Sequence, residues 1–317
     1  MHTPIRIGTR ESTLAVWQAT QVKELLEKEG FAAILVAIKS EGDIDLKTPL
    51  YEMGVQGIFT RSLDIALLNN RIDLAVHSMK DVPTQLPEGL QQAAVLKRGP
   101  VHDLLVYKGD TAFMQDRDSV ADIATSSIRR IAQWLNRYPK HRIHNLRGNV
   151  NTRLRRLGEA AWDGAIFAQA GLDRILLRPE KSVILDWMLP APAQGAIVVI
   201  ARADDEEVQL AGQPLNDPEA AVCTKIERDF LRTLLGGCST PISALAEIED
   251  GEVFFRGQLL SLDGRHKMEI EKILPFEKAD GIGRTAALEL LEEGGRAIVE
   301  SIRAAETQAV TAKAEAK

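Results

Sequence analysis

Cys238 is one of only two cysteines in the chain, and it lies in the segment Gly236-Gly237-Cys238-Ser239-Thr240, directly after an apolar helical pattern. Glycines commonly end a helix, so a ligand could reach this thiol, whereas Cys223 falls inside the helical pattern. A lone cysteine is more often an inert hydrophobic side chain than a nucleophile, and the residues alone leave both interpretations open. Two cysteines and scattered histidines at these spacings form no recognisable metal-ligand set, so no metal is expected.

A lysine and an aspartate follow an apolar strand pattern in the segment His77-Ser78-Met79-Lys80-Asp81-Val82-Pro83. Ligands of open α/β sheets gather at the carboxyl ends of the strands, so Lys80 and Asp81 are candidate catalytic residues. Asp81 could donate and accept a proton or stabilise a developing positive charge. A solvated ion pair in a loop is the alternative.

Three segments place arginine and short polar residues where a strand pattern gives way to a helix pattern. They are Gly8 to Ser12, Thr125 to Arg130, and Arg147 to Arg153. Free N–H groups and the helix dipole favour an anion at such a junction, and arginine can grip a carboxylate or phosphate with two hydrogen bonds. N-capping explains any one segment alone. Three of them together favour an anion site, and the pattern does not choose between carboxylate and phosphate.

The charge distribution supports an anion site in this part of the chain. Between Thr125 and Arg156 there is no Asp or Glu but eight Arg and one Lys, in a chain whose net charge is −6. Such a run creates a positive field that concentrates anions, although a solvated helix face is the ordinary alternative. The acidic net charge argues against general nucleic-acid binding. Neither a Walker A sequence nor a Rossmann glycine fingerprint is present.

The elements that must position these residues alternate between strand and helix patterns, which favours mainly parallel sheets covered by helices. Leu189 to Gly195, rich in Pro and Gly, is expected to connect two domains. The predicted strands are 5–8, 34–39, 73–77, 103–107, 120–124, 142–146, 165–168, 196–201, 252–260 and 267–274. The predicted helices are 14–26, 62–70, 127–137, 149–157, 217–235 and 283–303. The strand 196–201 is expected to return to the first sheet.

Composition limits the class of protein. A chain of 317 residues exceeds what one hydrophobic core usually supports, so two or three domains are expected. No run of 18 apolar residues occurs, which excludes a membrane-spanning helix of the usual kind. The amino terminus predicts a first strand rather than a secretion signal. Two cysteines give no disulfide framework and suit a reducing compartment, so the cytoplasm is expected.

The chain resembles the porphobilinogen deaminase family over roughly residues 4 to 303. The motifs that carry the resemblance occur in the family's order: GTRES, AVHSMKDVP, TSSIRR, LRGNVNTRL, LPAPAQGA and the GGC loop. The resemblance implies an α/β fold of three domains, of which the first two resemble type II periplasmic binding proteins with mixed, mainly parallel sheets and the site in the cleft between them. The third is a smaller α+β domain with a three-stranded sheet. The implied domains are 1–98 with 196–216, 99–195, and 217–304, followed by a disordered tail at 305–317.

The resemblance also implies an activity in tetrapyrrole biosynthesis. Members of the family are transferases that join four porphobilinogen molecules head to tail, release ammonia each time, and then free hydroxymethylbilane with water. They are primed by one dipyrromethane cofactor held as a thioether, for which Cys238 is the implied attachment point here. Asp81 is implied to stabilise positive charge and accept a proton beside the pyrrole nitrogens, with Lys80 as its neighbour. A monomer that binds no nucleic acid and no membrane is expected.

The carboxylates of the pyrroles give the arginine-rich window an implied purpose. The implied cofactor-binding residues are Cys238, Arg10, Ser12, Lys80, Asp81, Thr125, Ser126, Ser127, Arg129, Arg130, Arg147, Gly148, Asn149, Arg153, Ala170 and Gln194. The implied substrate-binding residues are Arg10, Ser12, Phe59, Arg147, Arg153 and Arg174.

The sequence departs from the family pattern at a few positions, and two other functions remain open. Glu52 and Gln56 stand in the lid loop where basic residues are frequent, and His102 replaces a common arginine. A non-catalytic solute-binding protein for an organic polyanion could use the same two-domain clamp, but it would carry a secretion signal and need no reactive thiol. An ordinary phosphate-binding α/β enzyme is the second alternative, and its phosphate-loop fingerprint is missing.

Overall fold

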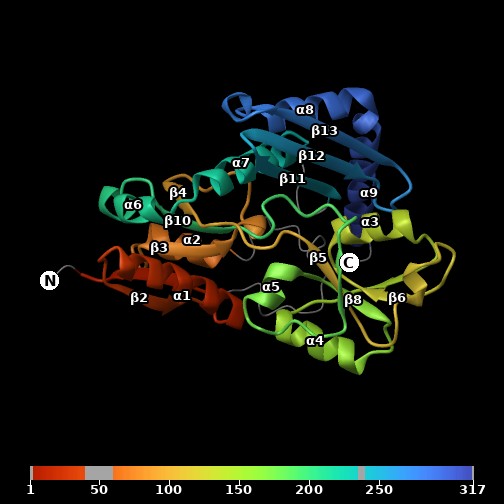
Figure 1. The fold of residues 1–317 in the computed structure, drawn as a ribbon, viewed down its shortest axis with the longest axis horizontal. Coiled ribbons are helices and arrows are strands. Elements are labelled where there is room, and N and C mark those ends of the chain that lie inside the picture. Colours follow the sequence, from red (N-terminus) through yellow and green to blue (C-terminus); the bar gives the residue numbers. More distant parts are fainter. Residues whose placement is uncertain (1–2, 40–59, 235–239, 316–317) are drawn as a thin grey trace.

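The protein folds into three units, each built on its own sheet (Figure 1). The structure is a computed structural model that describes residues 3–39, 60–234 and 240–315, the last ten of these by their backbone alone. Cys238, Phe59, Glu52 and Gln56 therefore lie outside the described residues. Within these ranges no helix has both the length and the apolar character needed to cross a membrane.

The first unit is a five-stranded mixed sheet with helices on both faces. Its strand order is β2-β1-β3-β10-β4, in which β10 runs antiparallel to both neighbours. The strands are β1 (Ile5–Thr9), β2 (Ala33–Ala37), β3 (Leu74–Ser78), β4 (Leu90–Val95) and β10 (Ile197–Arg202). Helices α1 (Thr13–Lys28) and α6 (Glu206–Gly212) pack on one face and α2 (Arg61–Leu68) packs on the other. The predicted return of the strand near 196–201 to this sheet is confirmed by β10.

The second unit repeats this plan with the strand order β7-β6-β8-β5-β9. Its strands are β5 (Asp103–Tyr107), β6 (Asp122–Ala124), β7 (Arg142–His144), β8 (Gly164–Ala168) and β9 (Ser182–Leu185). Helix α3 (Ile128–Arg137) packs through Trp134 on one face, and α4 (Val150–Glu159) packs through Leu157 on the other. The short helix α5 (Gln169–Asp173) follows β8 directly. Both arginine-rich helices therefore begin at the same edge of this sheet, where parallel strands β6 and β7 end.

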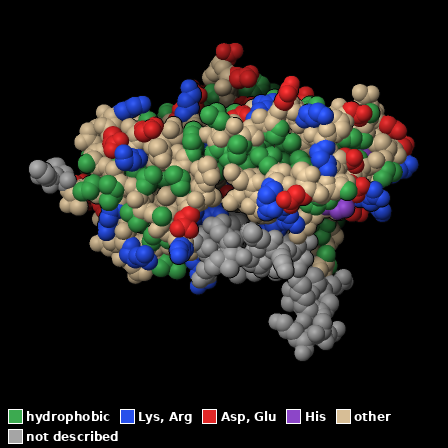
Figure 2. Space-filling model, turned by 90° about the horizontal axis from the view of Figure 1, so that it is seen from below, with side chains coloured by type: hydrophobic (Ala, Val, Ile, Leu, Met, Phe, Trp, Pro, Cys, Tyr) green, Lys and Arg blue, Asp and Glu red, His purple; other side chains and the backbone are tan. Residues whose placement is uncertain are grey.

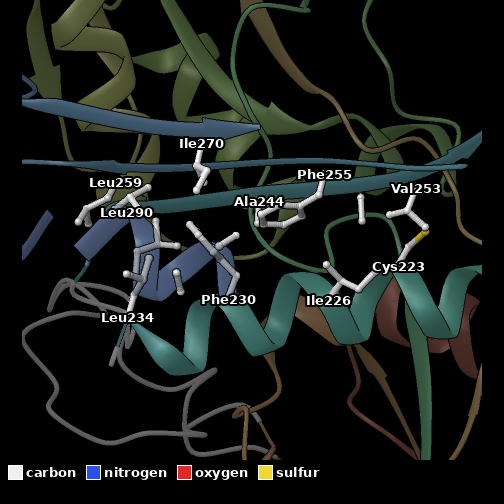
Figure 3. Close-up of a cluster of buried hydrophobic side chains, with 14 of the residues drawn as sticks. Cys223, Ile226, Phe230, Leu234, Ala244, Val253, Phe255, Leu259, Ile270 and Leu290 are labelled. Carbon is white, nitrogen blue, oxygen red and sulfur yellow. The ribbon is translucent and has the colours of Figure 1, made fainter. Parts of the chain in front are cut away.

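The third unit is a three-stranded antiparallel sheet, β11-β12-β13, covered by helices. Its elements are α7 (Pro218–Thr233), β11 (Ile242–Glu249), β12 (Glu252–Leu260), β13 (Lys267–Pro275), α8 (Ile282–Leu290) and α9 (Arg296–Glu315). Figure 3 shows its core, in which Phe230 of α7 meets Phe255 of β12 with ring centroids 5.3 Å apart and Cys223 lies among the apolar side chains. The predicted α/β class, with two mixed sheets and a three-stranded third unit, is confirmed. The exact domain boundaries stay a prediction.

Several local expectations differ from the structure. Strands β4, β9 and β11 were not among the predicted elements, and the expected helix 283–303 is interrupted by Gly294, whose φ of 131° is not helical. The sequence also predicts a disordered tail from 305 on, whereas the backbone of α9 continues to Glu315. The reason is composition, because the tail is rich in Ala, Lys and Glu, which are strong helix formers.

Candidate active site

The Lys80–Asp81 pair lies on a single 3₁₀ turn, Met79–Asp81, at the carboxyl end of β3. Met79 is buried and its N–H donates to the carbonyl oxygen of Ala196 at 3.0 Å, which ties the turn to the segment that leads into β10. Asp81 is exposed and Lys80 is half-buried. The turn therefore presents a carboxylate outward at the edge of the sheet where ligands are expected.

Lys80 is held by Gln194, a buried residue of the connection between the first two units. The Lys80 Nζ donates to the Gln194 Oε1 at 3.2 Å, and the Gln194 Nε2 donates to the Asp103 Oδ1 at 2.9 Å. Burial lowers the pKa of Lys80 to about 8; Arg130 and Arg129 lower it further, while Asp81 and Asp103 oppose the change. Lys80 thus titrates much closer to neutral pH than an exposed lysine.

Arg129 and Arg130 form a buried cluster with Asp103, the first residue of β5. The Arg129 Nη2 and Arg130 Nη2 donate to the two Asp103 oxygens at 2.7 and 2.8 Å. The Arg130 Nε also donates to the Asp103 Oδ1 at 3.2 Å, and Arg129 and Arg130 donate as well to the carbonyl oxygens of Leu189 and Ile166, respectively. Although burial favours the neutral acid, the two arginines hold the pKa of Asp103 below its ordinary value. Arg129 and Arg130 therefore stabilise the interior of the second unit and also add to the local positive charge.

Arg153 of α4 interacts electrostatically with Asp81, and Arg147, in the segment before α4, interacts with Arg153. The Arg153 Nε donates to the Gly148 carbonyl oxygen at 2.7 Å. Burial lowers the pKa of Arg153 to about 10, with Arg130 and Arg147 acting in the same direction and Asp81 opposing them. Arg147 is itself buried. One cationic side chain from each of the first two units, Lys80 and Arg153, thus interacts with the exposed Asp81 carboxylate.

Most of the short polar residues at the three junctions make local hydrogen bonds. The Ser12 Oγ accepts the Ala15 N–H at 3.4 Å and the Asn149 Oδ1 accepts the Thr152 N–H at 2.9 Å, so both cap their helices. Ser127 stands at the N-cap of α3 without a side-chain capping bond. The Thr125 Oγ1 accepts the Ser127 N–H, and Ser126 bonds with Asn145 and the Leu146 N–H. N-capping thus accounts for part of the pattern seen in the sequence.

His77, one residue before the end of β3, is a buried imidazole with an electrostatic link to Arg10. Within the described part of the chain, its Nε2 atom is buried and makes no hydrogen bond. Burial, and then the charge of Arg10, lower the pKa of His77 to about 3, so the ring is neutral. Arg10 therefore places its positive charge near the end of β3, beside a neutral His77.

Arg174 lies at the crossing of the two segments that join the first and second units. Its Nη2 donates to the Gly195 carbonyl oxygen at 2.6 Å, and its guanidinium lies 5.7 Å from the ring centre of Trp17 in α1. The Gly99 N–H also donates to the Gly195 oxygen, and a side chain at Gly195 would meet the Gly99 oxygen at 2.6 Å. Burial alone lowers the pKa of Arg174 to about 10. Arg174 is therefore placed at the interdomain connection rather than in the arginine cluster; nearby Ala170 is buried in α5.

The donor set fits a ligand with several carboxylates, such as a dipyrromethane. The charge of Arg130 disfavours the charged forms of Lys80 and Arg153, and Arg147 does the same to Arg153, so carboxylates placed among these side chains would lower the electrostatic energy. Figure 2 shows basic and acidic side chains interspersed on one face of the molecule. The other cysteine, Cys223, is buried in the core of the third unit, and burial raises its pKa to about 12, which disfavours its thiolate.

Two residues of this region were missed by the sequence analysis. Asp103 entered only as the start of a strand, yet it joins Arg129, Arg130 and Gln194. Arg228 of α7 was not considered, although it contacts the turn that bears Asp81. Asp103 could have been noticed in the sequence, because a carboxylate at the first position of an apolar strand is unusual and needs a partner. No local sequence pattern distinguishes Arg228.

Comparison with known proteins matches two family models to this chain. One, described as "Porphobilinogen deaminase, dipyromethane cofactor binding domain", covers residues 5–210, and the other, "Porphobilinogen deaminase, C-terminal domain", covers residues 221–292. A porphobilinogen deaminase of Syntrophobacter fumaroxidans is 41% identical over 302 residues, which are 94% of this chain and 97% of the relative. A probable porphobilinogen deaminase of Methanosarcina acetivorans is 40% identical over 303 residues, 93% of each chain.

Solved structures give more distant likenesses. The VFT2 domain of Bordetella pertussis BvgS has a TM-score of 0.42 at 12% identity, covering 67% of this chain and 86% of that one. The amino acid ABC transporter substrate-binding protein AbpA from Streptococcus pneumoniae, bound to L-arginine, has a TM-score of 0.37 at 14% identity and covers 67% and 86%.

Proposed function

The chain belongs to the porphobilinogen deaminase family, and from this premise we propose that it joins four porphobilinogen molecules head to tail and then releases hydroxymethylbilane. The expected dipyrromethane cofactor is confirmed by the family model that matches residues 5–210. The observation that carries the proposal is the exposed Asp81 carboxylate at the end of β3, with basic side chains of both units around it.

Asp81 is the residue to which we assign the charge stabilisation. Loss of ammonia from porphobilinogen breaks a C–N bond and leaves a cationic, electron-poor methylene carbon. A dipyrromethane bound among these residues would supply the pyrrole α-carbon for the new C–C bond, and the proton displaced from that carbon would need an acceptor. The Asp81 carboxylate can lower the energy of the cationic pyrrole and hold the departing proton, and preorganised charge of this kind is commonly the largest catalytic contribution.

The basic residues are assigned to the substrate and cofactor carboxylates. Each porphobilinogen adds one acetate and one propionate, so every addition brings two negative charges into the site. We assign carboxylate binding to Arg10, Ser12, Lys80, Thr125, Ser127, Arg129, Arg130, Arg147, Arg153 and Arg174. Arg129 and Arg130 would do so while retaining Asp103 as a partner, and Arg174 would act from the interdomain connection. Cys238 is the proposed anchor, and cytoplasmic location and a monomeric state are part of the proposal.

A direct test of the function uses the purified protein with porphobilinogen. We expect release of ammonia together with a bilane product that cyclises to a uroporphyrinogen, and an intact mass that exceeds the sequence mass by two pyrrole units. The non-catalytic solute-binding alternative predicts binding without ammonia release and an unmodified mass. That second result would reject the proposed function.

The lowered pKa of Lys80 predicts a pH dependence of turnover. Lys80 carries its positive charge below about pH 8 and loses it above that value. If this charge binds a substrate carboxylate, kcat/KM should fall as the pH rises through about 8, approaching tenfold per pH unit. The matched variant is Lys80→Arg, whose guanidinium stays charged throughout this range. Its profile should remain flat over the same interval, and an identical fall in both proteins would contradict the assignment.

A further inference from the structure

Arg228, on the face of α7 toward the first unit, crosses to the turn that bears Lys80 and Asp81. Its Nη1 donates to the carbonyl oxygens of Met79 at 3.2 Å and Val82 at 2.9 Å, and its Nη2 donates to that of Pro83 at 2.5 Å. These three carbonyls flank Lys80 and Asp81 on both sides. One side chain of the third unit thus holds the backbone of a turn in the first.

The chemistry of the side chain suits this task. A guanidinium presents several donors in one rigid plane, so it can bridge carbonyls that point in different directions, whereas a lysine ammonium acts as a single point. Burial lowers the pKa of Arg228 to about 10, with Arg232 acting in the same direction and Asp229 opposing it. Arg228 therefore stays positively charged near neutral pH, which strengthens its hydrogen bonds to neutral carbonyls.

Asp81 has little else to fix its position. In the described part of the chain its side chain makes no hydrogen bond, and its neighbours act on it electrostatically. The turn is closed by the Val82 N–H on the Met79 carbonyl oxygen at 3.1 Å, and it is also held by the Met79 N–H on Ala196 and by Lys80 on Gln194, the last two on the side toward the connection between units. The Arg228 bonds hold the opposite side, where the chain leaves the turn through Val82 and Pro83.

The preceding residue of α7, Glu227, contacts the connection between the first two units. Its carboxylate is fully buried and accepts from Arg98 at 2.6 Å, from the Ala193 N–H at 2.6 Å and from the Ala246 N–H at 2.8 Å. Two successive residues of one helix thus reach the interdomain connection and the Asp81 turn. In the sequence, the same helix leads directly into the segment that contains Cys238.

We infer that Arg228 is a positioning residue for the Asp81 turn: it fixes the carboxylate against the site that it serves, without touching substrate. This inference rests on the proposed function. It predicts that loss of the guanidinium lowers the rate of the chemical step more than it weakens substrate binding, because a displacement of about 1 Å can cost on the order of 10²-fold in rate.

The test replaces Arg228 in the complete, cofactor-bearing enzyme. We expect Arg228→Met to lower kcat roughly 10- to 100-fold, with KM changed less than about twofold and the two-pyrrole mass addition retained. Arg228→Lys should recover part of kcat. The matched control is Arg232→Met, one turn further along α7, where the side chain is exposed and pairs with Asp229; its kcat should equal that of the wild type.

A double variant separates positioning from general structural support. In an Asp81→Asn background, the further change Arg228→Met should cost little additional activity, because Arg228 acts through Asp81. Unchanged kcat in Arg228→Met, an equal loss in both backgrounds, or loss of the cofactor would overturn the inference. An inactive wild-type protein would instead reject the proposed function. If Arg228→Met fails to fold, Arg228→Lys in both Asp81 backgrounds gives the same comparison.

Discussion

Replacement of Asp81 by Asn should leave a folded protein that carries its cofactor but forms little bilane. The substitution keeps the size of the side chain and removes its negative charge at an exposed position on a turn whose backbone is held elsewhere. Loss of one preorganised electrostatic group costs about 10²- to 10³-fold in kcat, and we expect a loss on that scale. Ammonia release and bilane formation should fall together.

Two controls make the Asp81 result specific. Asp81→Glu keeps the charge but moves the carboxylate outward by about one bond length, so it should show an intermediate loss. The melting temperature of both variants should stay close to that of the wild type, because Asp81 is exposed and makes no hydrogen bond within the described chain. Near-normal turnover in Asp81→Asn would mean that another group stabilises the charge.

The position of the Lys80–Asp81 turn could be predicted because it depends on local sequence. The apolar run that ends at His77 marks a buried strand, and a polar pair directly after such a strand must lie at the edge of the sheet. The starts of the helices after Ser12 and Asn149 could also be predicted from local sequence, because a short polar capping residue precedes a clear helical pattern in each case. The return of the chain to the first sheet through β10 could be predicted from the strongly apolar composition of that strand.

The partners of the arginines could not be predicted, because they depend on which elements meet in space. The sequence predicts that Arg129 and Arg130 bind an anionic ligand. In the structure, however, α3 packs across the start of β5, and both arginines form ion pairs with Asp103. Arg174 and Gly195 are 21 residues apart in the sequence, and no local pattern links them. The crossing of the two interdomain segments brings them into contact. Strand β4 was missed because its polar residues, Gln91 and Gln92, interrupt the apolar pattern at the sheet edge.

Replacement of Cys238 by Ala should abolish both the cofactor and the activity. The family fixes the need for a dipyrromethane, and the chain offers only two thiols to carry it. Without a covalent primer, elongation has no starting chain, so we expect turnover to fall by about 10³-fold or more, the scale seen when a covalent catalytic group is removed. The purified variant should have the mass of its sequence alone.

The matched control for Cys238 is Cys223→Ala, and the structure explains why its outcome should differ. Cys223 of α7 lies in the core of the third unit, where burial raises its pKa to about 12, so almost no thiolate forms near neutral pH. Loss of this sulfur from the core should lower the free energy of unfolding by about 1 kcal/mol, while the two-pyrrole mass addition and bilane formation persist. A two-pyrrole adduct that disappears with Cys223 and survives loss of Cys238 would show that the anchor has been assigned to the wrong sulfur.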